Sequence, residues 1–303
     1  MPLKPILWGS HSPPFTATLD LARAARPESC ATGGTVLDVG ARGGEQTIEA
    51  LKLNFTHVIA VECQADEWYR LRGIWRNTPA VTLLHMCAGN DISLKTLYNA
   101  EGATSLMAST IKGHKAEVQR HAAALVQSDT VVAAPLDNLL WASAGAPMRR
   151  ETLCAVKVDV QGYEWYVLEG LNQTMAYHRP VVYVEYDHRF PYPPAHNPRK
   201  WLEQRGYQCI PFDSDKSHMV QIDGETTAEL GCRIGYCDLT CSVDWSRVEM
   251  YKFLSRWMES SDEKAGTGWW ARHKKIHEEL RAMAREWQDL QKGLGQAMLG
   301  GRR

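Results

Sequence analysis

The sequence predicts an α/β fold in which a mostly parallel sheet is covered by helices on both faces. Apolar runs of roughly five residues alternate along the chain with stretches whose apolar residues recur at helical spacing, a pattern typical of parallel strands connected by helices. A glycine-rich segment follows the first run, as in open α/β sheets that bind ligands at the carboxyl ends of their strands. With 303 residues, 44% of them hydrophobic and 23% charged, the chain can bury a sizeable core.

Seven strands and six connecting helices are predicted in order. Each strand is a short apolar run, and each helix carries apolar side chains three and four positions apart, the spacing that places them on one helical face. The last two strands are expected to close the sheet as an antiparallel pair. The predicted strands are residues 36–39, 57–61, 81–86, 155–160, 181–185, 207–212 and 236–243, and the predicted helices are residues 19–25, 46–54, 65–77, 114–126, 163–171 and 199–206.

The chain divides into three predicted regions. Residues 1–33 form an N-terminal extension packed on the main domain, residues 34–245 form that domain, and residues 246–303 form a helical C-terminal extension. Large apolar residues recur in the tail with gaps of four and three, which predicts a helix that lies on its own domain or pairs with a second copy of the chain. The spacing slightly favours a homodimer. The stripe consists of Ile276, Leu280, Met283, Trp287, Leu290, Leu294 and Met298.

Composition and charge argue against several kinds of partner and location. The formal net charge is -1 and the sequence pI is about 6.8, so we expect no binding to duplex nucleic acid. No segment reaches the roughly 18 apolar residues of a membrane span. The first residues also lack the apolar core of a signal peptide. These features predict a cytoplasmic protein without a membrane span.

The cysteines are scattered along a long chain. Such a pattern predicts free, reduced thiols. Cys232, Cys237 and Cys241 lie close together in the sequence, but their spacing matches no common zinc site.

The strongest ligand signal is the segment that begins with Asp38. Here an acid precedes the glycines, in the pattern Asp-x-Gly-x-x-x-Gly. A carboxylate at this strand end would repel a pyrophosphate but suits an ammonium group, directly or through water. Glu62 ends the second strand, 24 residues later, where an acid can accept both hydroxyls of a ribose. The alternatives are a tight turn without ligand and a helix-capping acid.

The glycine segment and five later segments resemble the FkbM family of methyltransferases. Residues 36–47 resemble its "DVGA-x-x-G" opening, and residues 61–62 its ribose-binding acid. Residues 135–140 are similar to "T-L-D-x-x-L", with Pro135 where Thr is usual, and residues 156–170 to "K-I-D-V-E-G-x-E-x-x-V-L-x-G". Residues 180–185 and 238–241 resemble its following strands. The resemblance covers residues 34–244, and Arg42 departs from the usual Asn.

This resemblance implies a Rossmann-like class I methyltransferase with a seven-stranded, mostly parallel sheet. It implies S-adenosyl-L-methionine as cofactor and a small-molecule or glycan acceptor, such as a sugar, a polysaccharide end or a natural product. The candidate cofactor-binding residues are Asp38, Gly40, Ala41, Arg42, Gly43, Gly44, Thr47, Glu62, Cys63, Ala88 and Asp159.

Ionisable residues at the ends of the fourth and fifth strands are the catalytic candidates. Lys157 and Asp159 stand two apart on one strand, so both project to the same face. Glu185, Asp187 and His188 close the next strand. We expect Asp159 and His188 to position or deprotonate the acceptor, with Lys157 and Glu185 as further catalytic candidates. The alternative structural role is an ion-pair network that fixes the two strand ends.

A divalent cation is an alternative to a protein base. Mg²⁺ or Mn²⁺ held by Asp159, Glu185 and Asp187 could lower the pKa of an acceptor hydroxyl. The expected activity is O-methylation of a sugar, glycan or natural-product hydroxyl. The rival hypotheses are N-methylation of protein or RNA and a non-catalytic cofactor-binding assembly module.

Overall fold

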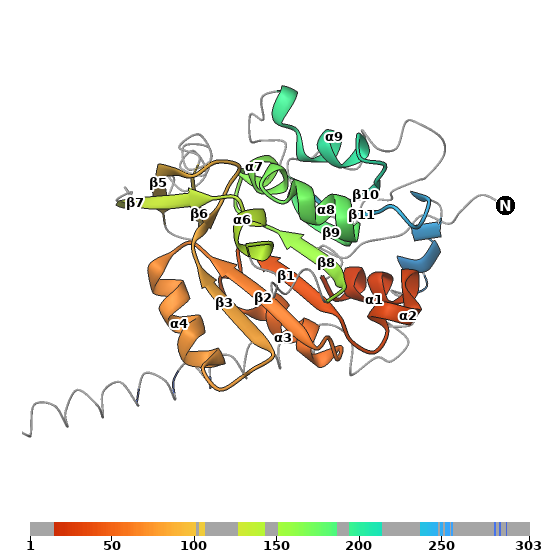
Figure 1. Ribbon diagram of the computed structural model, residues 1–303, viewed down its shortest axis with the longest axis horizontal. Coiled ribbons are helices and arrows are strands. Elements are labelled where there is room, and N and C mark those ends of the chain that lie inside the picture. The colour runs from red at the N-terminus through yellow and green to blue at the C-terminus, as the bar shows by residue number, and fades with distance from the viewer. Residues whose placement is uncertain are drawn as a thin grey trace, which may run out of the picture.

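A seven-stranded sheet forms the centre of the fold (Figure 1). Its strands are β1 (Thr35–Val39), β2 (His57–Glu62), β3 (Val81–His85), β8 (Leu153–Val158), β9 (Val181–Tyr186), β10 (Gln208–Asp213) and β11 (Cys237–Ser242). Their spatial order is β10-β11-β9-β8-β1-β2-β3. The pairs from β3 to β9 are parallel, whereas β11 runs antiparallel to both of its neighbours. The predicted sheet, with its closing antiparallel pair, is confirmed.

The computed structural model describes only part of the chain. The described residues are 15–100, 103–106, 127–142, 151–186, 194–213, 237–247, 249–250, 252–254 and 256, together with Ala282, Arg285 and Asp289.

Helices cover both faces of the sheet, as predicted. Alternate residues of β2 enter different cores, with Ile59 and Val61 on one face and Val58 and Ala60 on the other, because side chains alternate along a strand. The first face is covered by α6 (Asp137–Leu140), α7 (Glu164–Glu169), α8 (Asn172–His178) and α9 (Pro198–Glu203). The second is covered by α1 (Phe15–Ala25), α3 (Glu45–Lys52) and α4 (Ala65–Trp75). The short elements α2 (Pro27–Cys30) and η2 (Pro194–His196) complete the described helices.

A second, smaller sheet was not predicted from the sequence. It contains β4 (Cys87–Ala88), β5 (Ser93–Ala100), β6 (Ala103–Ser105) and β7 (Gln127–Ala134), in the order β4-β7-β5-β6. The strands β5 and β7 pair over a long sequence separation, from Ser93 with Ala133 to Asn99 with Gln127. Their mixed polar sequences carry little of the apolar signal that marks the central strands. The helix predicted at residues 114–126 lies outside the described residues.

The prediction of free thiols is wrong for six of the cysteines. Three disulfides form between segments that are 124, 24 and 32 residues apart, so no local pattern in the sequence identifies the pairs. Such bonds persist mainly in oxidising compartments. Among the described residues, no group of metal-binding side chains is found, and Cys232 lies outside them. The pairs are Cys30–Cys154, Cys63–Cys87 and Cys209–Cys241.

Both terminal extensions contribute to the core on one face of the sheet. Phe15 and Leu19 of α1 are buried in the same cluster as Met250 and Leu254. Residues 15–30 and the described residues 250–254 therefore pack on the same face of the central sheet. The apolar stripe at residues 276–298 lies outside the described residues, so the homodimer and the domain boundaries stay predictions. No helix in the described part of the chain could cross a membrane.

A buried acid lies where α3 packs against α1. Glu49 is 6% exposed. Burial raises the pKa of its carboxyl to about 7, although hydrogen bonds from Thr16 of α1 oppose this shift. The folded state therefore holds a proton near pH 6 that the unfolded chain releases.

We expect Glu49 to make the fold less stable as pH rises. Its contribution is complete below about pH 4.5 and is lost as pH approaches about 7, a difference of roughly 3 kcal/mol at 1.36 kcal/mol per pKa unit. Urea unfolding of Glu49→Gln between pH 4.5 and 8 should lack this decline and show a more stable protein at pH 8. The exposed Glu28→Gln should keep the wild-type curve. An unchanged decline in Glu49→Gln would contradict the assignment.

Candidate active site

The glycine loop between β1 and α3 is fixed tightly to the ends of two other strands. Gly40 has φ +82°, and a Cβ atom there would lie 1.9 Å from the backbone oxygen of Asp159, so no larger residue fits. The amides of Gly40 and Ala41 donate to the Val61 oxygen at 2.9 and 3.1 Å. Gly44, with φ +85°, precedes α3. The sequence predicted this loop, and the packing shows why it needs glycine.

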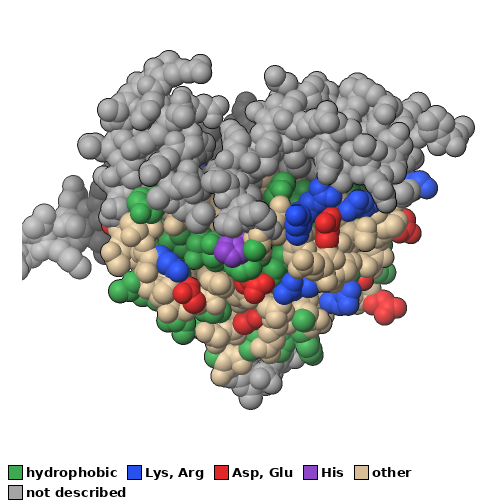
Figure 2. Space-filling view, turned by 90° about the horizontal axis from the view of Figure 1, so that it is seen from above, with side chains coloured by type: hydrophobic (Ala, Val, Ile, Leu, Met, Phe, Trp, Pro, Cys, Tyr) green, Lys and Arg blue, Asp and Glu red, His purple; other side chains and the backbone are tan. Residues whose placement is uncertain are grey.

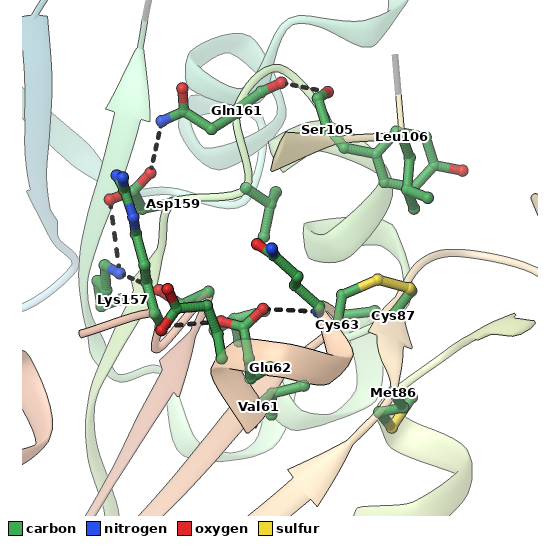
Figure 3. Close-up of a pocket in the computed structure, with 18 of the residues that line it drawn as sticks. Val61, Glu62, Cys63, Met86, Cys87, Ser105, Leu106, Lys157, Asp159 and Gln161 are labelled. Atoms are coloured by element: carbon green, nitrogen blue, oxygen red, sulfur yellow. Dashed lines mark hydrogen bonds and ion pairs between the residues drawn. A yellow bond between two sulfur atoms is a disulfide. The ribbon is translucent and has the colours of Figure 1, made fainter. Parts of the chain in front are cut away.

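Glu62 closes β2 with its carboxylate at the edge of a cavity (Figure 3). It is 7% exposed. One carboxylate oxygen accepts from the Arg42 amide and the other from the Gln64 amide, each at 2.7 Å. Burial raises the pKa of Glu62, and these two amides oppose the shift. Each carboxylate oxygen keeps a further lone pair, so the group can still accept hydrogen bonds from a diol.

Asp38 lies behind the loop rather than in the cavity. It is fully buried and is not among the lining residues. Its Oδ2 accepts from the Thr47 hydroxyl at 2.9 Å, and its Oδ1 lies 3.5 Å from Lys157 Nζ. The contact of Asp38 with an ammonium group, directly or through water, therefore stays a prediction. Asp38 supports the loop through Lys157, whose ammonium donates to the Gly40 oxygen at 2.7 Å.

Lys157 joins the two acids that were predicted from the sequence. Its Nζ also lies 3.5 Å from Asp159 Oδ2, and its side chain is only 2% exposed. Burial would lower the pKa of this ammonium, but the charges of Asp159 and Asp38 outweigh burial and raise it. Lys157 therefore stays charged at neutral pH. A charged lysine can orient a carboxylate, but it cannot take up a proton.

Asp159 and Glu185 form an acid pair bridged by an unpredicted residue, Gln161. The Gln161 Nε2 lies 3.1 Å from Asp159 Oδ1 and 2.9 and 2.8 Å from the two Glu185 oxygens. Figure 3 shows Gln161 and Asp159 on one side of the cavity. Gln161 has φ +57°, a conformation in which few residues other than glycine are found.

The two acids of this pair differ in environment and in charge. Burial raises the pKa of Glu185 well above its usual range, and the charge of Asp159 raises it further. Burial also acts on Asp159, but the charge of Lys157 and the Gln161 amide outweigh it, and its pKa is lowered. Asp159 therefore gives up its proton more readily than Glu185 and is ionised at neutral pH. The Asp159 side chain is 33% exposed, so its carboxylate can reach a ligand.

The cavity has a volume of about 680 Å³ and brings most of the predicted residues together, a size within the range of small-molecule sites. Asp38, Ala41, Gly44, Thr47 and Glu185 were predicted but do not line it. His188 and Asp187 lie outside the described residues. The predicted residues that do line it are Gly40, Arg42, Gly43, Glu62, Cys63, Ala88, Lys157 and Asp159.

Several lining residues were missed. Leu97 of β5 and Ser105 of β6 come from the smaller sheet, and Tyr163 follows the fourth central strand. Arg70 of α4 donates to the Arg42 oxygen at 2.6 Å and so braces the glycine loop. Gln161 directly follows a strand that the sequence predicts, and this position is the one sequence feature that could have identified it as a site residue. The others meet only after distant segments pack together.

The described residues on one face of the molecule carry both signs of charge. In the face shown in Figure 2, acidic and basic side chains are interspersed over the described residues. A nucleic-acid-binding surface would show a basic patch or stripe instead. This face therefore gives no support to duplex nucleic acid as a partner.

The sheet order, the glycine loop after β1 and the acid after β2 define a Rossmann-like methyltransferase fold. The sequence profile of the methyltransferase FkbM domain matches residues 38–209. This match covers more than half of the chain, and the chain belongs to the FkbM methyltransferase family. The resemblance inferred from the sequence motifs is confirmed. No curated protein matches the chain at a significant level.

Solved methyltransferase structures are also similar to the chain. Methyltransferase FkbM from Methylobacillus flagellatus KT is 14% identical, with a TM-score of 0.42, over 69% of this chain and 44% of that one. This chain therefore spans less than half of that protein. Precorrin-6y C5,15-methyltransferase from Geobacter metallireducens GS-15 is 10% identical, with a TM-score of 0.34, over 74% of this chain and 86% of that one. The ribosomal protein L11 methylase of Lactobacillus delbrueckii subsp. bulgaricus is 12% identical, with a TM-score of 0.34, over 74% of this chain and 78% of that one.

Proposed function

We propose that the chain is an S-adenosylmethionine-dependent methyltransferase that acts on a hydroxyl of a sugar, glycan or natural product. The observation that carries the proposal is Glu62, a buried acid with free lone pairs at the edge of the cavity. It is hydrogen-bonded to the glycine loop through the Arg42 amide, and a ligand can approach the backbone of this loop closely. The residues present thus fit a nucleoside with a ribose diol at Glu62.

The cofactor, when bound, supplies a methyl group on a positively charged sulfur. The chain must then align the acceptor hydroxyl and receive its proton. Asp159 is suited to this role because it is ionised, partly exposed and on the cavity wall. Lys157 holds its Oδ2 and Gln161 its Oδ1, so the carboxylate is fixed in orientation. The role of His188 stays a prediction, since this residue lies outside the described part.

The geometry favours a methyl-transfer mechanism in which no metal ion binds to the Asp159–Glu185 pair. The Gln161 amide nitrogen already contacts three of the four carboxylate oxygens of the pair. The pKa of Glu185 is also raised well above its usual range by burial and by the charge of Asp159, which favours the protonated carboxyl, a poor ligand for Mg²⁺ or Mn²⁺. Assay in EDTA, with and without added Mn²⁺, tests this part of the proposal. Loss of activity in EDTA that Mn²⁺ restores would favour the metal alternative.

The cytoplasmic location and the homodimer stay predictions. Three disulfides weigh against a reducing compartment, where thiols are usually kept reduced.

An acceptor scan tests the proposed function. Cofactor with a labelled methyl group is incubated with the protein and with pools of monosaccharides, oligosaccharides, hydroxylated natural products, proteins and RNA. We expect label in a hydroxyl-bearing small molecule or glycan. Transfer only to protein or RNA would contradict the proposal. In parallel, calorimetry should detect binding of S-adenosylhomocysteine, and a protein that binds none would contradict the cofactor assignment.

A further inference from the structure

One disulfide lies in the wall of the proposed cofactor site. Cys63 directly follows Glu62, and Cys87 belongs to β4. Both residues line the cavity, and Figure 3 shows their sulfur–sulfur bond among the lining residues. The other two disulfides do not line the cavity. The Cys63–Cys87 bond is thus placed to affect the ligand site directly.

We propose that the Cys63–Cys87 disulfide positions the nucleoside-binding wall and that its reduction weakens cofactor binding. This inference rests on the proposed function of the cavity. The bond joins the residue after Glu62, the proposed ribose-binding acid, to the residue before Ala88, another candidate cofactor-binding residue that lines the cavity. The disulfide therefore fixes the distance between the two chain segments that form this wall of the nucleoside site.

The disulfide links the chain segments that follow β2 and β3, just beyond the last paired residues of these two strands. The last registered pair of β2 and β3 is Glu62 with His85, and the Met86 amide still donates to the Glu62 oxygen at 3.2 Å. Past this point the chain leaves the central sheet for the smaller one. Cleavage would remove this cross-link between two cysteines that are 24 residues apart in the sequence.

Reduction changes the distance between the two sides of the wall. Bonded sulfurs lie about 2.05 Å apart, whereas two non-bonded atoms need roughly 3.5–4.0 Å. The two thiols must therefore separate by about 1.5 Å. The amides that hold the Glu62 carboxylate belong to Arg42 and to Gln64, the neighbour of Cys63. Movement of Cys63 therefore changes the geometry of the ribose acceptor.

Access to reductant also differs among the three disulfides. Cys63 is half-buried, whereas Cys30, Cys154, Cys209 and Cys241 are almost fully buried. Thiol–disulfide exchange requires that a thiolate reach one of the sulfurs. In the reaction, two thiols of dithiothreitol form one disulfide, and Cys63 and Cys87 gain two electrons and two protons. We expect this bond to be reduced first.

Calorimetry with S-adenosylhomocysteine tests the proposal. Oxidised wild-type protein and protein reduced with dithiothreitol are compared, with free thiols assigned by alkylation and peptide mass spectrometry. We expect the Kd to rise about tenfold on reduction, as for the loss of a pre-organised site, and to recover on reoxidation. The double variant Cys63→Ser/Cys87→Ser should show the raised Kd and no response to dithiothreitol.

The remote disulfide supplies the matched control. Cys209→Ser/Cys241→Ser removes a cross-link between β10 and β11 and should keep both the wild-type Kd and its response to dithiothreitol. Wild-type affinity in protein shown to be reduced at Cys63 and Cys87 would overturn the proposal, even if the serine variant fails to fold. An equal loss of affinity in both double variants would also overturn it, since the effect would then be general destabilisation. If oxidised wild-type protein binds no S-adenosylhomocysteine, the proposed function itself fails.

Discussion

Replacing Glu62 by alanine is expected to weaken S-adenosylhomocysteine binding by about a hundredfold or more. The variant loses two hydrogen bonds from the ribose to a charged acceptor, each worth about 1.5–3 kcal/mol. The acid is 7% exposed, so water cannot readily replace the lost contacts. Isothermal titration calorimetry at neutral pH measures the change directly.

Glu62 also accepts hydrogen bonds from the backbone amides of Arg42 and Gln64. A control is therefore needed to show that the substitution does not disturb the glycine loop. Glu62→Gln keeps an oxygen acceptor but loses the charge, and we expect an intermediate affinity. Thermal unfolding without ligand shows whether either variant loses the fold. Wild-type affinity in a folded Glu62→Ala protein would reject the ribose assignment.

Asp159→Asn is expected to lower methyl transfer by about a hundredfold or more, the range typical of a lost acid–base group. The substitution keeps the size of the side chain but removes the negative charge that receives the acceptor proton. Lys157 keeps Asp38 as a partner, so the fold should survive. Binding of S-adenosylhomocysteine should change little, because the ribose acceptor is elsewhere. The initial rate is measured with the acceptor that the labelled-cofactor scan identifies.

Glu185→Gln is the matched variant for this test. Burial and the charge of Asp159 raise the pKa of Glu185 well above its usual range, which favours the neutral carboxyl that an amide imitates, so we expect a much smaller loss of rate. Full activity in Asp159→Asn would contradict the role of Asp159 both as a base and as a metal ligand. Equal losses in both variants would show that the bridged pair acts only through its packing.

Much of the fold could be predicted because its signals are local. The strands of the central sheet are short apolar runs, and their order along the chain is enough to expect a doubly wound sheet. The smaller sheet could not be predicted in this way. The strands β5 and β7 join residues such as Ser93 and Ala133, and their polar sequences contain no periodic signal that separates them from loops.

The candidate site likewise combines features that the sequence predicts with features that depend on tertiary contacts. By itself the sequence determined the glycine loop, the acid at Glu62 and the pairing of Lys157 with Asp159 on one strand face, because each depends on neighbouring residues. Only the tertiary structure decided that Asp38 supports the loop from behind, that Gln161 bridges two acids, and that Cys63 pairs with Cys87. It also decided that the pKa values of Asp159 and Glu185 shift in opposite directions, since burial and neighbouring charges set each pKa. These properties arise from contacts between distant segments, which a linear pattern does not record.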